Sequence, residues 1–335
     1  MMLKNAATYL TNSPFITRIV SWAKAKTFPG FQGVSLFEVI RFLYDEVIMN
    51  SSTTTRANSI AFSFFMSLFP ALLVLFSLIP FIITLLPVKL SDITDQIQFT
   101  LNEIMPNKTG EDFTKFVTSF LKKKRSDYFS VGFILSIYFA SNGLMALMRG
   151  FEKNHVVFIR LTYWQKLLRA IGMTFMLGIL LVISTVLVIL GNQIFSWFFK
   201  LLKISKVTVV FIIFLKWLIV IGSIYLGIAV IYRYGVATRR QLHFFSPGAM
   251  TATILSLLSS IGFSFYVDHF GKYDKVYGSF VAGIVLLLWL QLNAIILIFG
   301  FELNAAIAVN RDSMMTIKDI TDDIEEDKED FENIF

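Results

Sequence analysis

The chain has no cysteine among its 335 residues. A disulfide framework, a thiolate nucleophile and a zinc–sulfur site are therefore excluded. Histidine is nearly as scarce, since His155, His243 and His269 lie in separate segments without HxH or HExxH spacing. Asp268, His269 and Asp274 offer three donors and no fourth. The sequence also lacks a P-loop, a GxSxG elbow and a GxGxxG turn. We therefore expect no enzyme, no cofactor and no metal site.

Charged residues are also few. They make up 16% of the chain against 56% apolar residues, and the mean hydropathy is +0.68. An ordinary soluble domain is about 25% charged and roughly 45–50% apolar. Composition excludes a plain cytosolic enzyme, a secreted disulfide scaffold and a disordered tail protein. It indicates an integral membrane protein.

Six stretches are long and apolar enough to cross a bilayer, which takes about 20 residues. We therefore predict an all-α, polytopic membrane protein with six transmembrane helices. Residues 1–35 form an N-terminal tail, 36–309 the membrane domain and 310–335 an acidic tail. The expected spans are Ser59–Leu86, Asp127–Met148, Leu167–Phe195, Val207–Tyr232, Phe245–Val267 and Ser279–Val309.

The distribution of charge predicts an orientation. An even number of spans places both termini on one side, and that side holds sixteen Lys and Arg residues against twelve on the other. The positive-inside rule then favours cytoplasmic termini, although the run Lys122–Arg125 falls on the expected outer side. The acidic tail has a net charge of −7, so the rest of the chain carries +14. Such a basic excess suits anionic lipid headgroups, and we expect no nucleic-acid partner.

Two segments outside the spans have helical patterns. Leu36, Ile40, Leu43 and Val47 share one face of a helix, which predicts an amphipathic interfacial helix before the first span. The segment 88–126 repeats apolar residues at helical spacing on both sides of a proline. It is predicted to form a helical outer loop that either caps the bundle or lies on the lipid surface.

Polar residues inside the spans are the first candidates for function, because a lone polar group in hydrocarbon costs several kcal/mol. Lys216 lies deep in the fourth span and either snorkels to the interface or contacts a substrate. In the sixth span, Asn293, Gly300 and Asn304 share one face, while Gln291 and Glu302 share another. Glu302 is either an interfacial ion pair, with Arg149 or Arg233 as its partner, or part of a substrate path. Asn142 is a weaker candidate in the second span.

Two further patterns concern helix shape and packing. Small residues recur every fourth position in the fifth span, which is typical of close helix packing and would also suit a sliding surface. Pro70 and Pro80 predict kinks in the first span. The small residues are Gly248, Ala252, Ser256, Ser260 and Ser264.

Three segments carry a resemblance to a known family. They are RANSIAFSFFMSLFPALLVLFSLIP, SNGLMALMRGFEKN and the stretch from SPGAMTATIL through VYGSFVAGIVLLLWLQLN to FGFELNAAI. In their order and spacing they resemble the YihY / virulence factor BrkB family of bacterial inner-membrane proteins, over roughly residues 36–310. The resemblance implies six spans and cytoplasmic termini. It also implies an envelope role, with suggestions of lipid or lipopolysaccharide handling and of resistance to host defences.

The family has also carried a ribonuclease BN label. Three scattered histidines argue against a metal-dependent ribonuclease, which needs clustered His and Asp ligands. We expect a non-enzymatic protein that moves or flips a lipid or small amphipathic substrate. The alternatives are a structural envelope protein without a transport path and an intramembrane enzyme acting on a lipid headgroup. Membrane lipids are the expected partners, and a second copy of the chain or another envelope protein stays open.

Overall fold

The computed structural model describes residues 14–49, 52–85, 126–201, 209–239, 243–270 and 279–332. Within these residues the chain forms eight α-helices and one π-helical turn, η1, so the all-α prediction is confirmed for them. The elements are α2 (Pro14–Ala25), α3 (Leu36–Leu43), η1 (Tyr44–Met49), α4 (Ser52–Leu85), α7 (Ser126–Gly150), α8 (Tyr163–Leu201), α9 (Val209–Gly235), α10 (Pro247–Phe270) and α12 (Ser279–Glu332).

A long helix covers each of the six predicted spans. Four of these helices, among the described residues, contain a segment long and apolar enough to cross a membrane: Tyr163–Leu187, Phe214–Gly235, Pro247–Tyr266 and Gly283–Ile317. Membrane spanning is thus supported for α8, α9, α10 and α12, and the count of six remains a prediction. The acidic tail is not a separate element up to Glu332, because α12 continues through it. The predicted outer loop lies almost entirely in 86–125, outside the described residues.

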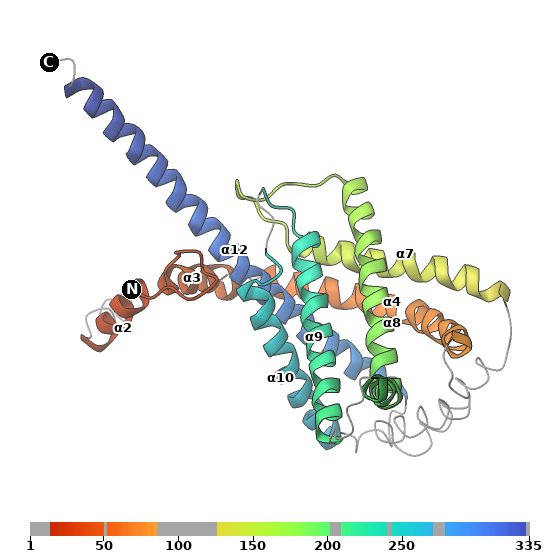
Figure 1. Cartoon of the computed structure of the whole chain (residues 1–335). Coiled ribbons are helices and arrows are strands. Elements are labelled where there is room, and N and C mark those ends of the chain that lie inside the picture. Colours follow the sequence, from red (N-terminus) through yellow and green to blue (C-terminus); the bar gives the residue numbers. More distant parts are fainter. Residues whose placement is uncertain are drawn as a thin grey trace.

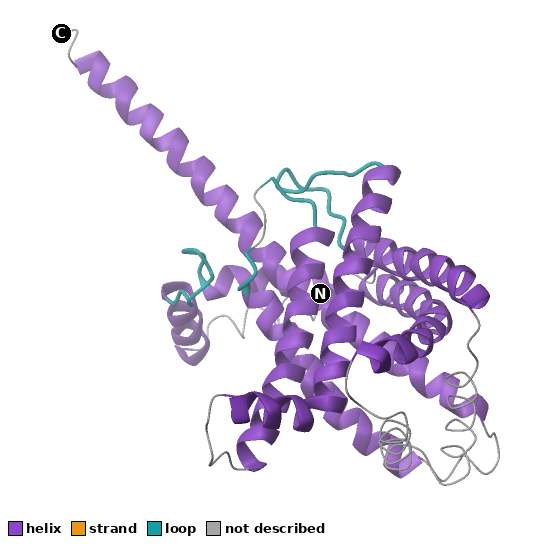
Figure 2. Cartoon of the chain, turned by 45° about the vertical axis from the view of Figure 1, so that its right-hand side comes forward, coloured by secondary structure: helices purple, strands orange, loops and turns teal. Residues whose placement is uncertain are grey.

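The helices run in two main directions. Figure 1 shows α9 and α10 side by side, with α4 and α7 running across them, and α12 passing obliquely through the bundle. The last part of α12 projects away from the other helices (Figures 1 and 2). The loops that follow α7 and α9 meet through an antiparallel bridge between Phe158 and Thr238. We call the end of the bundle where these two loops meet the bridged end.

The predicted amphipathic helix is present, but its buried face differs from the prediction. Ser35 caps α3, accepting a hydrogen bond from the Glu38 N–H while the Glu38 carboxylate accepts from the Ser35 N–H. Val39 is buried, whereas Ile40, predicted to lie on the apolar face, is 52% exposed. The reason is that α3 packs against α12, where Val39 joins Leu303 and its neighbours. One cylindrical partner covers only a narrow strip of a short helix.

The main hydrophobic core lies at the bridged end. It draws residues from α4, α7, α9, α10 and α12, including Ile60, Leu147, Tyr232 and Phe301. Phe151 stacks on Phe301 with ring centroids 4.6 Å apart. Away from this end, large apolar side chains of α8, α9 and α10 are exposed, as expected of helices that face lipid.

Candidate functional site

A buried carboxylate lies at the centre of the most polar region. Glu302, in α12, has no solvent-exposed area. Its Oε1 lies 3.3 Å from Arg56 Nη1, and its Oε2 lies 2.7 Å from Lys153 Nζ. A buried carboxylate is tolerated only when cations and hydrogen bonds compensate its charge. Two cations from different parts of the chain do so here.

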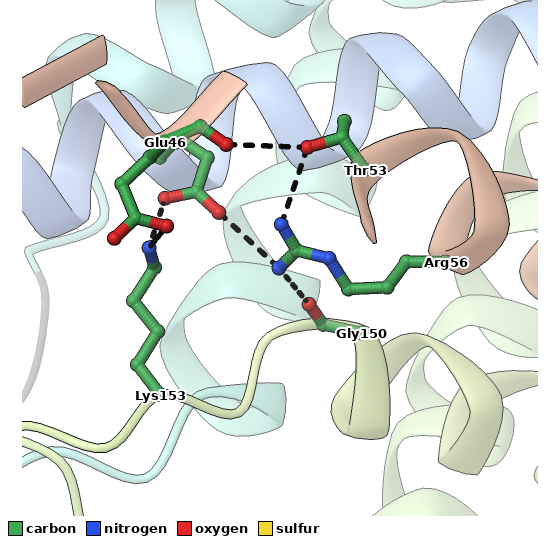
Figure 3. Close-up of polar contacts among 6 residues, drawn as sticks. Glu46, Thr53, Arg56, Gly150 and Lys153 are labelled. Atoms are coloured by element: carbon green, nitrogen blue, oxygen red, sulfur yellow. Dashed lines mark hydrogen bonds and ion pairs between the residues drawn. The ribbon is translucent and has the colours of Figure 1, made fainter. Parts of the chain in front are cut away.

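Arg56 links Glu302 to two other helices. It lies in the second turn of α4, and its guanidinium also donates to the Gly150 carbonyl at the end of α7, at 2.9 Å. A third bond, 3.3 Å long, goes to Thr53 Oγ1 on its own helix (Figure 3). The carbonyls at the end of a helix lack partners within it, and a cation there also interacts favourably with the helix dipole. Arg56 therefore ties α4, α7 and α12 together.

Lys153 comes from the loop after α7. Its Nζ lies between two carboxylates, 2.8 Å from Glu46 Oε2 and 2.7 Å from Glu302 Oε2. The ammonium also lies 5.0 Å from the centre of the Phe42 ring, which adds a cation–π contact. Glu46 belongs to η1, and its carbonyl accepts a hydrogen bond from Thr53 Oγ1 (Figure 3). Glu46, Arg56, Lys153 and Glu302, which we call the charged cluster, thus combine two acids with two bases.

A second buried contact lies one turn away on a different face of α12. Asn304 Oδ1 accepts from the Gly248 N–H at 2.9 Å, and its Nδ2 donates to Ser246 Oγ at 3.1 Å. Gly248 is at the start of α10, where backbone N–H groups have no partner within the helix. A Cβ on Gly248 would lie 2.0 Å from the Gly300 carbonyl oxygen. Only glycine therefore permits this approach of α10 to α12.

The other polar residues predicted in the sixth span contact protein. Gln291 donates to Asn58 Oδ1 in α4 at 2.8 Å, so Gln291 and Glu302 both contact α4, as their shared face predicts. Asn293 donates to the Trp289 carbonyl of its own helix. Gly300 and Asn304 both face α10. The sixth span thus directs its polar groups toward neighbouring helices or its own backbone.

The predicted partners of Glu302 are wrong. Arg149 is exposed at the end of α7, and the Arg233 guanidinium lies 4.4 Å from the centre of the Phe244 ring. Both were expected because they end their spans on the same side as Glu302. The residues that do pair with Glu302 are Arg56, which begins a span, and Lys153, which lies in a loop.

The remaining candidates lie apart from the charged cluster. Lys216 is half-buried in α9 and makes no hydrogen bond or ion pair with the described residues. It lies about 26 Å along the helix from Arg233, at 1.5 Å per residue. Asn142 is half-buried in α7. Helix α4 continues through Pro70 and Pro80, whose side chains are outside the described part.

The stripe of small residues is buried over part of its length. Gly248, Ala252 and Ser256 are buried, and the first two contact Gly300 of α12. Ser260 and Ser264 are exposed. The helices approach only where α10 crosses α12, so a seam predicted over four turns is formed over about two.

Clefts lie beside the charged cluster. One of about 340 Å³ is lined by Phe42, Glu46, Arg56, Lys153 and His155, among others. A second, of about 400 Å³, lies where the loop after α7 meets α8. None of the three clefts described in the structure is lined by Lys216 or Gln291. In the described part of the chain, no group of three His, Asp or Glu side chains is placed to hold a metal ion.

The sequence analysis missed three of the four cluster residues: Glu46, Arg56 and Lys153. All three stood outside the predicted spans, where charged residues are ordinary. A signal did exist, because Arg56 and Lys153 lie within the segments that carry the family resemblance, RANSIAF and GFEKN. A buried carboxylate in the sixth span also requires cations from elsewhere.

Comparison with known families decides the relationship. The model of the family described as virulence factor BrkB matches residues 46–322. The chain belongs to this family. The match includes all four residues of the charged cluster, from Glu46 to Glu302.

Relatives extend across bacteria. The ribonuclease-like protein YfkH of Bacillus subtilis is 25% identical over 258 residues, which are 75% of this chain and 88% of that protein. A UPF0761 membrane protein of Tolumonas auensis is 24% identical over 254 residues, 75% of this chain and 79% of its own. Another, from Pseudoalteromonas translucida, is 33% identical over 95 residues, 28% of this chain and 32% of its own. No solved structure matches. The chain is therefore a multi-pass membrane protein of the BrkB/UPF0761 family.

Proposed function

We propose that this protein handles an anionic lipid or another small amphipathic molecule in the bacterial inner membrane, moving it between leaflets, and that it is not an enzyme. The observation that supports this function best is the charged cluster with its adjoining cleft. Arg56 and Lys153 border a cleft of about 340 Å³ at the bridged end of otherwise apolar helices. An anionic headgroup that entered the cleft would compete with Glu302 and Glu46 for these two cations.

Competition of this kind would couple binding to a change of shape. Lys153 comes from a loop, and its contacts to Glu46 and Glu302 join that loop to η1 and α12. A phosphate oxygen that replaced one carboxylate would loosen one of these links. Charge-assisted hydrogen bonds of this type are roughly twice as strong as neutral ones. The exchange is therefore a step that a substrate could drive.

A second candidate is a structural envelope protein without a transport path. The close contact between Gly248 and Gly300 favours it, as does the absence of Lys216 and Gln291 from the described clefts. In that case the charged cluster would only hold helices together.

A leaflet-exchange assay separates the two candidates. Vesicles containing the protein and a fluorescent phosphatidylglycerol are treated with a reductant that cannot cross the bilayer. Under the proposal, wild type exposes dye that stays protected in protein-free vesicles, and Lys153→Gln protects it again. Ser313→Ala, at an exposed position of α12, serves as the control and behaves as wild type. Folded wild-type protein that leaves the inner-leaflet dye protected would contradict transport of this lipid class and favour the structural candidate.

We also propose six spans with both termini in the cytoplasm. The bridge between Phe158 and Thr238 supports this topology, because the loops it joins belong on the same side of the membrane. The chain has no cysteine, so single cysteines report without background. Ser313→Cys should be shielded from an impermeant thiol reagent in intact cells, and Ser126→Cys should be labelled. The reverse pattern would invert the orientation.

A further inference from the structure

A cleft at the start of α8 has features of its own. It measures about 400 Å³ and is lined by Glu152, Asn154, Arg160, Leu161 and Lys166. Helix α8 contains a segment apolar enough to span the membrane, beginning at Tyr163. The cleft therefore lies where a span begins, which is the depth of the lipid headgroups.

The cleft carries positive charge that the protein does not neutralise. Lys166 forms an ion pair with Glu152, but Arg160 donates to the neutral amide oxygen of Asn154. Arg239 is held nearby, because its N–H donates to the Val157 carbonyl at 3.0 Å. Its side chain and that of Arg169 are exposed. The surroundings of the cleft therefore keep a basic excess.

Exposed apolar side chains lie next to these bases. Trp164 and Leu168, one turn apart on α8, are each 70% exposed. Tyr163 packs edge-on against Trp164 with ring centroids 5.6 Å apart. Tyr and Trp are enriched at membrane–water interfaces, where one part of the ring is apolar and another reaches water. An occupant must therefore present an anion to Arg160 and hydrocarbon to Trp164 and Leu168.

We propose that this cleft binds the phosphate headgroup of an anionic phospholipid in the surrounding bilayer, with the acyl chains lying against Trp164 and Leu168. The guanidinium of Arg160 would donate two parallel hydrogen bonds to phosphate oxygens, a geometry that Arg favours. The site is distinct from the charged cluster. It holds whether the protein moves lipid or has a structural role, so it stands apart from the proposed function.

The test uses quenching of Trp164 by brominated lipids. The protein is placed in nanodiscs of phosphatidylcholine and phosphatidylglycerol, with bromine on the acyl chains of one lipid at a time. The chain has five tryptophans, so the signal of a Trp164→Phe variant is subtracted. We expect stronger quenching when the bromine is on phosphatidylglycerol at equal mole fraction. Arg160→Gln should reduce this preference roughly fivefold, the equivalent of about 1 kcal/mol for one basic residue near the surface.

Two controls identify the ligand. Arg41→Gln removes an exposed arginine of α3, away from the cleft, and should leave the preference unchanged. Inorganic phosphate, compared with chloride at equal ionic strength, should not abolish it. Equal quenching by both lipids, or a preference that survives Arg160→Gln in folded protein, would overturn the proposal. Loss of the preference in inorganic phosphate would assign the cleft to a free anion and overturn the lipid assignment.

Discussion

The two ends of α9 are similar in hydropathy but differ in packing. At the bridged end, Tyr232 is 1% exposed, and its hydroxyl donates to the Leu297 carbonyl at 2.8 Å. At the other end, Phe214, Trp217 and Leu218 surround Lys216 along the chain, and all three are exposed. The first end is fixed by protein contacts, and the second presents apolar side chains of the kind that lipid covers. In a membrane helix, an apolar residue alone does not reveal which of these environments it occupies.

The same contrast runs along α10. Its first half brings Gly248 and Ala252 against α12, while Ile261 and Phe265 in its second half are exposed. Small residues and polar groups therefore indicate protein contact better than hydropathy does. The bridged end should be sensitive to substitution, and the opposite end tolerant.

The largest expected effect comes from removing the central carboxylate. Glu302→Ala leaves Arg56 and Lys153 close together without their shared partner, and breaking such a buried pair costs about 3–5 kcal/mol. The melting temperature in detergent should fall sharply. Asp312→Ala removes an acid from the same helix, for which the structure describes no ion pair, and should melt close to wild type. Equal melting of both variants would show that the charged cluster contributes little.

A single methyl group at the α10–α12 contact should also destabilise the protein. Gly248→Ala places a Cβ 2.0 Å from the Gly300 carbonyl oxygen, so the helices must separate. Overpacking of this kind costs about 1–3 kcal/mol. The matched control is Gly262→Ala in the same helix, where a Cβ meets open space and alanine should be neutral or slightly stabilising. Thermal melting of the pair tests the contrast within one helix.

The serines of α10 extend this comparison by one turn. Ser256 is buried, whereas Ser260 is exposed. Ser256→Leu should lower stability by about 1–3 kcal/mol through overpacking, and Ser260→Leu should change it by less than about 0.5 kcal/mol. If Ser260→Leu is as damaging as Ser256→Leu, another surface must cover the second half of α10.

The smallest effect is expected at Lys216. Since the described residues offer this ammonium no acid or hydrogen-bond acceptor, Lys216→Leu should leave melting unchanged or raise it. A loss of folded protein would reveal a partner. A folded variant with lost envelope function in a complementation assay would instead restore Lys216 to the substrate path.

The sequence predicted the helices better than the site. Apolar runs located six long helices because a span must be a continuous hydrophobic segment. The faces of Gln291, Gly300, Glu302 and Asn304 followed from helical spacing alone. The partners of Glu302 did not, because they depend on how a loop and the start of α4 fold back onto α12. Hydropathy also could not show where the stripe of α10 leaves its partner, since lipid and protein interiors are equally apolar.

The central claim is that Glu302 and its cations act as one unit that holds the bridged end together. A double-mutant cycle of Lys153→Gln and Glu302→Gln, followed by unfolding in detergent, measures this directly. The side chains are 2.7 Å apart and at most 9% exposed, so we expect the double variant to be less destabilised than the sum of the single ones. The coupling should be about 0.5–3 kcal/mol. Additive effects, within about 0.5 kcal/mol, would contradict the account.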